Sequence, residues 1–147
     1  MKKVALAVAL VVAAQLGWSA GGKAASCYSP AAVEAEQAIR YMTELMVISS
    51  ACQNTTYAEF RLRNRDAIIA YQKSMITHFR GAPAFDKWNT VIANESAHRQ
   101  GNTALGTFCQ QAEATLKHAA TLDMQAFRAF AAQKAAAAGT QYPKCGK

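Results

Sequence analysis

Apolar residues recur at helical spacing through residues 29–52 and cover a wide arc of the helical cylinder. Ser29 stands where an N-cap belongs, and Pro30 takes the first helical position, where its missing N–H would be unpaired in any case. So wide an apolar arc predicts a central helix that is touched on two sides. Three charged residues fill the remaining strip at i, i+4 spacing, which we interpret as a solvated face: Glu36, Arg40 and Glu44.

The next apolar stripe predicts one long helix from Thr55 or Thr56 to about Arg80. Glu59 is placed to complete a capping box at the start of this helix. Leu62 belongs to a second apolar flank of the same helix, so we expect it to be covered.

Two or three further helices follow. The third helix begins near Pro83, and its predicted buried side is Phe85, Trp88, Val91 and Ile92. The segment 101–103 reads Gly-Asn-Thr and predicts a turn or kink before a fourth helix over 105–116. Thr121 is the expected N-cap of a last helix, which Gly139 ends as a C′ residue. With only three prolines and short β-branched runs, the chain is predicted to be an all-α bundle of four to five helices.

The amino terminus has the pattern of a secretory signal peptide. Lys2 and Lys3 precede an apolar run over residues 4–16, and small residues follow. This run is too short to cross a bilayer, which needs about 20 helical residues. We expect cleavage before Cys27, giving a signal peptide of residues 1–26 and a single helical domain of residues 27–147. The alternative is a lipoprotein in which Cys27 is acylated.

The mature chain then keeps four cysteines in an oxidising compartment, and an even number predicts two disulfides. Three pairings are possible from the sequence. Geometry ranks one of them first, because joining the two chain ends and joining two helix termini in the middle would brace the bundle twice: Cys27–Cys145 with Cys52–Cys109.

Charge and motifs exclude several functions. Part of the formal net charge of +7 belongs to the targeting segment, so a nucleic-acid footprint is not supported. No mature helix opposes a Lys/Arg face to an apolar one, so we expect no stable membrane insertion after signal cleavage. Serine-nucleophile motifs, glycine-rich phosphate loops, paired-carboxylate spacings and the haem motif C-x-x-C-H are missing. We therefore predict no cofactor and no catalytic residues.

Two constellations could still carry chemistry. Glu95-Ser96-Ala97-His98 has the E-x-x-H spacing of di-iron bundles, but those bundles need it twice, and it occurs once here, so no metal site is predicted. The second constellation is a polar set between otherwise apolar flanks: Arg61, Asn64, Arg65, Glu95 and Arg99. It forms a buried ionic network, or a receptor for anions if a cleft opens, or its side chains simply reach solvent.

Several segments together resemble small exported helical proteins of Gram-negative bacteria that are uncharacterised: Cys27, residues 39–46 leading to Cys52, Asn94-Glu95-Ser96 and Phe108-Cys109. The likeness covers most of the mature chain and implies a periplasmic address, with no activity attached.

These observations lead to one expected function and one alternative. We expect a non-enzymatic, periplasmic or secreted helical protein that acts as a protein-interaction or stress-protective module on an unknown periplasmic protein. The alternative is a protein that binds a small anionic ligand through the Arg/Glu set. An enzyme would require a cleft that holds His78 or His98 beside a carboxylate.

Overall fold

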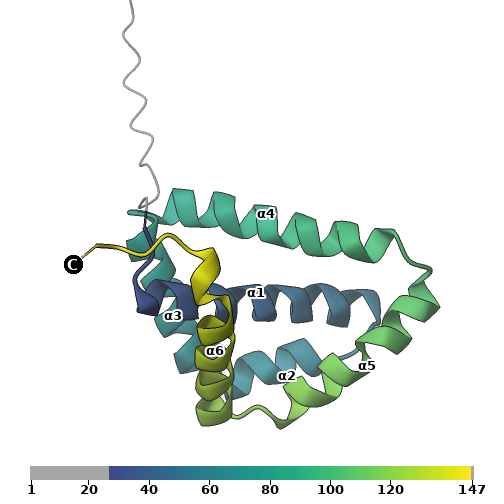
Figure 1. The fold of residues 1–147 in the computed structure, drawn as a ribbon. Coiled ribbons are helices and arrows are strands. Elements are labelled where there is room, and N and C mark those ends of the chain that lie inside the picture. Colours follow the sequence, from purple (N-terminus) through teal and green to yellow (C-terminus); the bar gives the residue numbers. More distant parts are fainter. Residues whose placement is uncertain (1–26, 147) are drawn as a thin grey trace, which may run out of the picture.

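The computed structural model describes residues 27–146, and these residues form an all-helical fold (Figure 1). The predicted signal peptide, residues 1–26, lies outside the described residues. Six α-helices and one 3₁₀ turn follow each other along the described chain: α1 (Pro30–Ala51), α2 (Thr56–Arg63), α3 (Arg65–His78), α4 (Ala82–Gly101), α5 (Leu105–Thr121), α6 (Met124–Ala138) and η1 (Gly139–Gln141). No helix among them is long and apolar enough to span a membrane.

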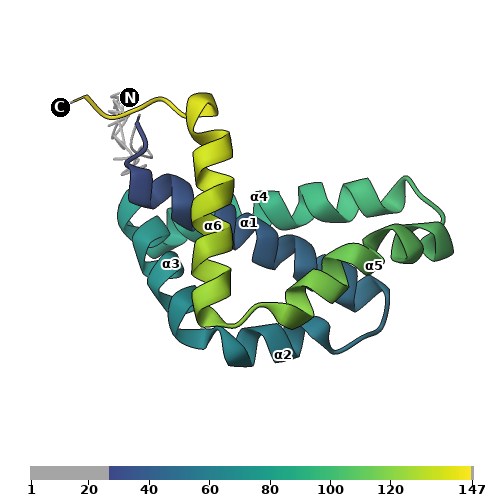
Figure 2. The same ribbon diagram turned by 60° about the horizontal axis from the view of Figure 1, so that its bottom comes forward.

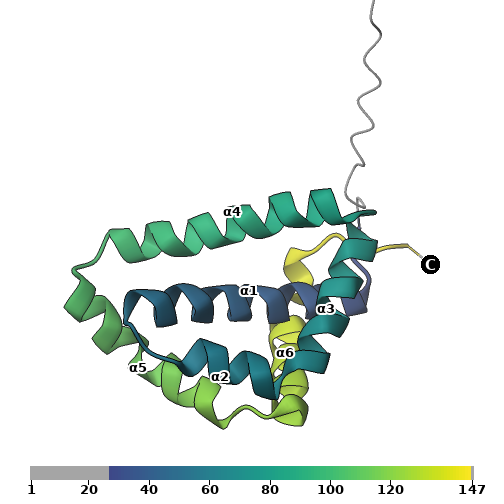
Figure 3. The same ribbon diagram turned by 180° about the vertical axis from the view of Figure 1, so that it is seen from behind.

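Helix α1 is the central element, as the sequence predicted. It contacts each of the other five α-helices. Figures 1 and 3 show α4 along one side of α1 and α2 with α5 on the opposite side, while α3 and α6 lie toward its N-terminal end. Ser29 caps α1 by accepting a hydrogen bond from the Ala32 N–H at 3.1 Å, and Pro30 is its first residue.

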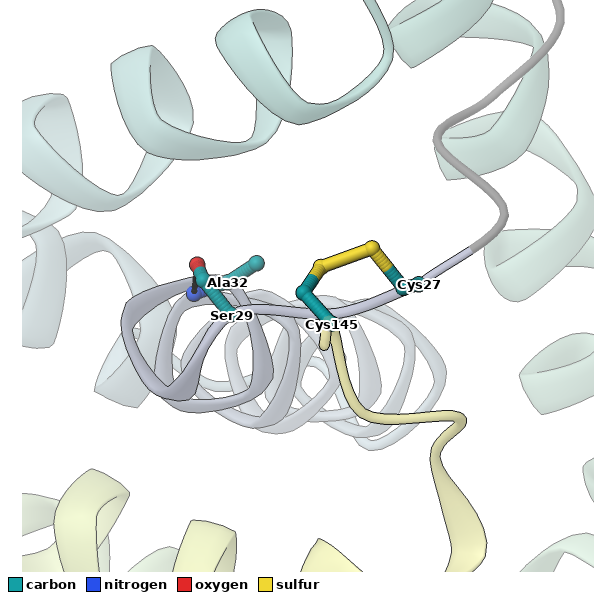
Figure 4. Close-up of a disulfide and its surroundings, with 4 residues drawn as sticks. All are labelled: Cys27, Ser29, Ala32 and Cys145. Carbon is teal, nitrogen blue, oxygen red and sulfur yellow. Dashed lines mark hydrogen bonds between the residues drawn. A yellow bond between two sulfur atoms is a disulfide. The ribbon is translucent and has the colours of Figure 1, made fainter. Parts of the chain in front are cut away.

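Both predicted disulfides are present, with the pairing that geometry ranked first. Cys27–Cys145 joins the two ends of the described chain beside the start of α1 (Figure 4). Cys52–Cys109 joins the C-terminal end of α1 to α5. Each end of the central helix is thus covalently tied to a distant part of the chain.

The core forms around aromatic residues that α1 covers. The Phe60 and Phe127 rings are fully buried and meet edge to face, with centroids 4.9 Å apart. Tyr71 packs edge-on against Phe127 at 5.7 Å, and Ile39 and Leu45 of α1 are also fully buried. Burying each such side chain stabilises the fold by about 1.5–3 kcal/mol, so apolar packing is the main source of stability.

The prediction of one long second helix is wrong, because this segment forms two helices, α2 and α3, that are separated at Asn64. The Asn64 side chain is fully buried, and its Nδ2 donates to the carbonyls of Phe60 and Leu122, each at 3.0 Å. Asparagine competes with the helical backbone through such local bonds, which is why the break falls here. Leu62, near the end of α2, is 79% exposed, so the second apolar flank predicted for this helix is not buried at this residue. The bundle therefore has six α-helices in the described part of the chain.

The N-terminal caps of α2 and α6 differ from their predictions. The Thr56 N–H is accepted by Asn54 Oδ1 at 3.1 Å, while Glu59 accepts from the Thr55 hydroxyl and makes no capping box. At α6 the N-cap is Asp123, whose carboxylate accepts from the Ala126 N–H at 2.8 Å. Asp123 lies two residues after Thr121, the expected cap, and its carboxylate makes a charge-assisted hydrogen bond that is stronger than the bond of a threonine hydroxyl.

Two neighbouring expectations had different outcomes. Thr121, the expected cap of the last helix, is instead the last residue of α5. The last helix does end at Gly139 as predicted, but Gly139 is its C-cap residue with a right-handed φ of −58° and leads into η1.

Helices α4 and α5 project together away from α3 and α6 (Figure 2). The predicted turn at 101–103 is confirmed, since α4 ends at Gly101 and α5 begins at Leu105. Phe85 and Ile92 of α4 are buried as expected, whereas Val91 is about half exposed. A projecting helix is covered on a narrower strip than a helix inside a bundle, and Val91 lies outside that strip.

Candidate functional site

The structure separates the five polar residues that the sequence analysis singled out. Arg61 and Arg65 line one groove, while Glu95 and Arg99 line a smaller pocket formed with other residues. Asn64 lines neither, because it is buried at the helix break. Helix α1 lies between α2 and α4 (Figures 1 and 3), which keeps the two pairs on different sides of the central helix. The single arginine–glutamate cluster of the prediction does not form.

The larger site, which we call the arginine groove, has a volume of about 630 Å³. It is bounded by α1, α2, α3 and one residue of α4, and its lining is Met42, Thr43, Met46, Tyr57, Ala58, Arg61, Leu62, Arg65, Ile68, Ile69, Gln72 and Asn89. Most of these side chains are apolar, and the polar ones include two arginines. This combination gives an amphipathic surface with a positive edge.

The groove exposes apolar side chains that a folded domain ordinarily covers. Leu62 is largely exposed, and Ile69 is 36% exposed. Met46 is partly exposed and adds an unbranched, polarisable side chain that adapts to partners of different shape, while the buried Met42 forms the floor beneath it. An exposed apolar patch with a polar rim is typical of a binding surface.

The two arginines of the groove are free of acidic partners. Within residues 27–146, no carboxylate lies within 4.0 Å of the charged nitrogens of Arg61 or Arg65. Arg61 instead stacks over the Tyr57 ring, with its guanidinium carbon 5.6 Å from the ring centroid. Stacking orients the planar group and leaves its N–H donors available, which suits the recognition of a carboxylate or phosphate.

The smaller pocket has a volume of about 290 Å³, and its lining carries charges of both signs: Arg40, Glu44, Glu95, Arg99 and Lys134. Glu95 pairs with Arg40 of α1 at 3.7 Å, so it meets an arginine of a neighbouring helix, although not Arg61 or Arg65. Arg99 donates to the Ser96 hydroxyl on its own helix at 3.1 Å. Because two carboxylates lie among these cations, the pocket suits an anion less well than the arginine groove does.

A second polar centre, which the sequence analysis missed, surrounds Glu36. This side chain was expected on a solvated face but is only 2% exposed. Its Oε1 accepts hydrogen bonds from Arg40 Nε at 2.8 Å and from the Tyr142 hydroxyl at 2.9 Å. Gln37 donates to the same hydroxyl at 2.9 Å. A buried carboxylate is tolerated only with partners of this kind.

Tyr28 and His78 extend this centre. Their rings stack with centroids 4.1 Å apart, and the Tyr28 ring also contacts the Tyr142 ring at 4.7 Å. Burial, followed by the negative charge of Glu36, raises the pKa of both tyrosine hydroxyls, which keeps them protonated. Burial also lowers the pKa of His78, against the opposing pull of Glu36, so the ring is held neutral.

Two atoms of this centre lack partners. Glu36 Oε2 and His78 Nε2 are buried and have no hydrogen-bond partner among the described residues. We call the ensemble of the Cys27–Cys145 disulfide with Tyr28, Glu36, His78 and Tyr142 the terminal clasp. In the sequence, only the pairing of Cys27 with Cys145 indicates where the terminal clasp lies, because this disulfide brings Tyr28 and Tyr142 to the start of α1.

Comparison with known proteins adds no relative. No family model, no curated protein and no solved structure matches this chain significantly. Among the described residues, no group of three or more His, Cys, Asp or Glu side chains is arranged to hold a metal ion. Glu95 and His98 of the E-x-x-H segment are both exposed.

Proposed function

We propose that this chain is an exported, non-enzymatic binding protein whose arginine groove takes up an acidic, amphipathic segment of another protein. One observation carries the proposal: Arg61 and Arg65 line an exposed apolar groove and have no acidic partner among residues 27–146. Opposite charge would come from the partner, and apolar contact would supply most of the affinity. A stress-protective role is one way in which such binding would be used.

A helical partner segment fits the groove best. The groove runs between helices, and helix-in-groove recognition places apolar side chains at i, i+3, i+4 and i+7 onto such a floor. Met42 and Met46 let the floor adapt, while Arg61 and Arg65 select against basic segments.

Two features support the proposed periplasmic address. The amino terminus has a secretory pattern, and all four cysteines are paired in disulfides, which form and persist in oxidising compartments. Fractionation of a Gram-negative expression host should recover the mature chain in the periplasm with an amino terminus at Cys27. Recovery in the cytoplasm with four free thiols would refute the address.

The groove is tested with designed peptides. The probe is a fluorescent amphipathic helical peptide with leucine on one face and glutamate on the other, and its counterpart carries lysine for glutamate. We expect only the acidic peptide to bind. The double variant Arg61→Ala/Arg65→Ala should lower the affinity for this peptide at least tenfold. Lys87→Ala/Arg99→Ala is the matched control, since both residues are exposed on α4 and the variant also removes two positive charges.

Three results would overturn the assignment of the groove: equal binding of both peptides, no effect of the groove variant, or an equal effect of the control. A photo-crosslinker placed at the exposed Leu62 then captures natural partners. The proposal requires that the crosslinked segment be acidic and amphipathic, and that capture fail in the Arg61→Ala/Arg65→Ala variant.

A small anionic amphiphile is the second candidate occupant. The volume of about 630 Å³ lies within the range of small-molecule sites, and the two arginines would hold the anion. Thermal unfolding with dodecanoate below its micelle concentration separates the candidates. A ligand at 100 times its Kd stabilises a protein by about 2.7 kcal/mol, which is readily measured. A shift that needs Arg61 and Arg65, together with no binding of the acidic peptide, would favour this candidate.

A further inference from the structure

A second cavity, independent of the arginine groove, lies where the two chain ends meet. It has a volume of about 520 Å³ and is bounded by the start of α1, by the last turns of α6 and by residues 142–145, which we call the C-terminal strap. The space exists because the α6 side of the cavity consists of alanines, namely Ala132, Ala135 and Ala136. An alanine-rich helix end leaves room that longer side chains would fill. We call this cavity the clasp pocket (Figure 4 shows the adjoining disulfide).

Glu34 places a negative charge in the lining of the clasp pocket. Its Oε1 accepts a hydrogen bond from the Tyr71 hydroxyl at 2.7 Å, which fixes the orientation of the carboxylate. No basic side chain lies within 4.0 Å of this carboxylate in residues 27–146. The charge is therefore available to a ligand.

Two aromatic rings, Tyr28 and Tyr142, also line the clasp pocket. The Tyr142 hydroxyl is held between Gln37 and Glu36, and the Tyr28 ring is held against His78. These contacts fix the rings before any ligand arrives. The faces of aromatic rings attract cations, and rings combined with a carboxylate are a recurrent way to bind organic ammonium groups.

Lys144 is the one positively charged residue in the described lining of the pocket. The residue is exposed, and it lies on the strap, where its backbone bridges to Tyr28. A lysine side chain at such a position can keep its ammonium group in water. A cationic ligand would not need Lys144, whereas an anionic ligand would depend on it, and this difference makes the sign of the ligand charge testable.

We propose that the clasp pocket binds a small organic ammonium compound that carries an apolar substituent. The ammonium group lies near Glu34 and the tyrosine rings, and the apolar substituent lies along the alanine wall of α6.

Titration calorimetry with two probes of equal chain length tests the proposal on the oxidised mature protein. The probes are hexyltrimethylammonium and hexanoate. We expect the ammonium probe to bind and hexanoate not to bind. Glu34→Gln should weaken the ammonium probe at least tenfold, while the amide oxygen still accepts from Tyr71. Lys144→Ala should leave its affinity unchanged or raise it.

Two further variants exclude indirect effects. Glu44→Gln removes an exposed carboxylate from the same helix outside the pocket and should change nothing. Ala136→Leu fills the alanine wall at an exposed position and should abolish binding without lowering the thermal midpoint. Binding of hexanoate that is lost in Lys144→Ala would overturn the proposal. So would binding of neither probe, or an ammonium affinity that Glu34→Gln leaves intact. None of these outcomes depends on the arginine groove.

Discussion

The two ends of the central helix α1 are built in different ways. At its N-terminal end a disulfide, two tyrosines and a neutral histidine enclose the buried carboxylate of Glu36. At its C-terminal end a disulfide ties α1 to α5, and the arginine groove lies beside the C-terminal half of the helix, with Met42 and Met46 in its lining. The N-terminal end buries its charged carboxylate among hydrogen-bond donors, although Glu36 Oε2 and His78 Nε2 have no partner among the described residues, whereas the groove leaves apolar and cationic groups for a partner.

This difference shows how the protein combines a stable scaffold with a binding surface. Glu36 and Tyr142 are 106 residues apart in sequence, so their hydrogen bond forms only when both chain ends are held together. The Cys27–Cys145 bridge supplies that proximity. The C-terminal half of α1 also buries apolar side chains, namely Met42, Leu45 and Ile48, and the arginine groove lies beside it.

Loss of the terminal disulfide should have the largest effect. Loop-closure entropy assigns roughly 4 to 5 kcal/mol as an upper value to a bridge between residues this far apart. We expect Cys27→Ser/Cys145→Ser to cost more than Cys52→Ser/Cys109→Ser, because it closes the longer loop and also releases Tyr28 and Tyr142 from Glu36. Urea unfolding followed by circular dichroism measures both. A greater cost for the internal pair would show that the terminal clasp contributes little.

Removal of the buried carboxylate should rank second. Glu36→Ala eliminates the acceptor of Tyr142 and Arg40, and about 2–3 kcal/mol of stability should be lost, because Arg40 is half exposed and can turn to water. Glu44→Ala on the exposed face of α1 is the control and should stay within about 0.5 kcal/mol of the wild type.

The same substitution tests the link between the disulfide and the buried carboxylate. In a Cys27→Ser/Cys145→Ser background, Glu36→Ala should cost clearly less, since the strap that carries Tyr142 is already released. Equal costs in both backgrounds would mean that the disulfide and the carboxylate act independently.

Asn64 anchors the other region, where α2 and α3 meet the turn before α6. Asn64→Ala leaves the Leu122 carbonyl without its donor and opens a small void, so we expect a loss of about 2 kcal/mol in urea unfolding. Asn94→Ala, at an exposed position within α4, should change stability little. If the two variants behave alike, the helix break does not depend on the Asn64 side chain.

The sequence predicted the helical class, the central position of α1 and two disulfides, because these follow from apolar periodicity and from the number of cysteines. Of the three possible pairings, it only ranked the observed one first. It did not predict the break at Asn64, since the acceptor on Leu122 belongs to a turn 58 residues away. It placed Glu36 in solvent for the same reason: Tyr142 comes from the far end of the chain.

The polar set that the sequence singled out is divided between two places. Arg61 and Arg65 line the arginine groove, whereas Glu95 and Arg99 line another pocket, and ligand binding by either pair stays a prediction. Helical spacing assigns a residue to a face of its own helix but does not say which helix that face meets. The clasp pocket had no signal in the sequence, because the alanines that leave it open look like an ordinary helical tract.

The smallest expected effect is a pH dependence confined to the terminal clasp. Burial lowers the pKa of His78 in the folded protein below the ordinary value of 6.5, so the unfolded state takes up the proton first as the pH falls. Stability contributed by neutral His78 is therefore present above pH 6.5 and is lost as the pH drops below it toward the folded-state pKa.

The groups that face His78 are Tyr28 and Glu36, and the wild-type carboxylates also titrate at low pH. The informative quantity is thus a difference: between pH 7.5 and pH 5.5, wild type should lose more unfolding free energy than His78→Phe, whereas the exposed-site variant His98→Phe should follow the wild type. Identical pH profiles for wild type and His78→Phe would show that the histidine adds no pH dependence to the stability of the terminal clasp.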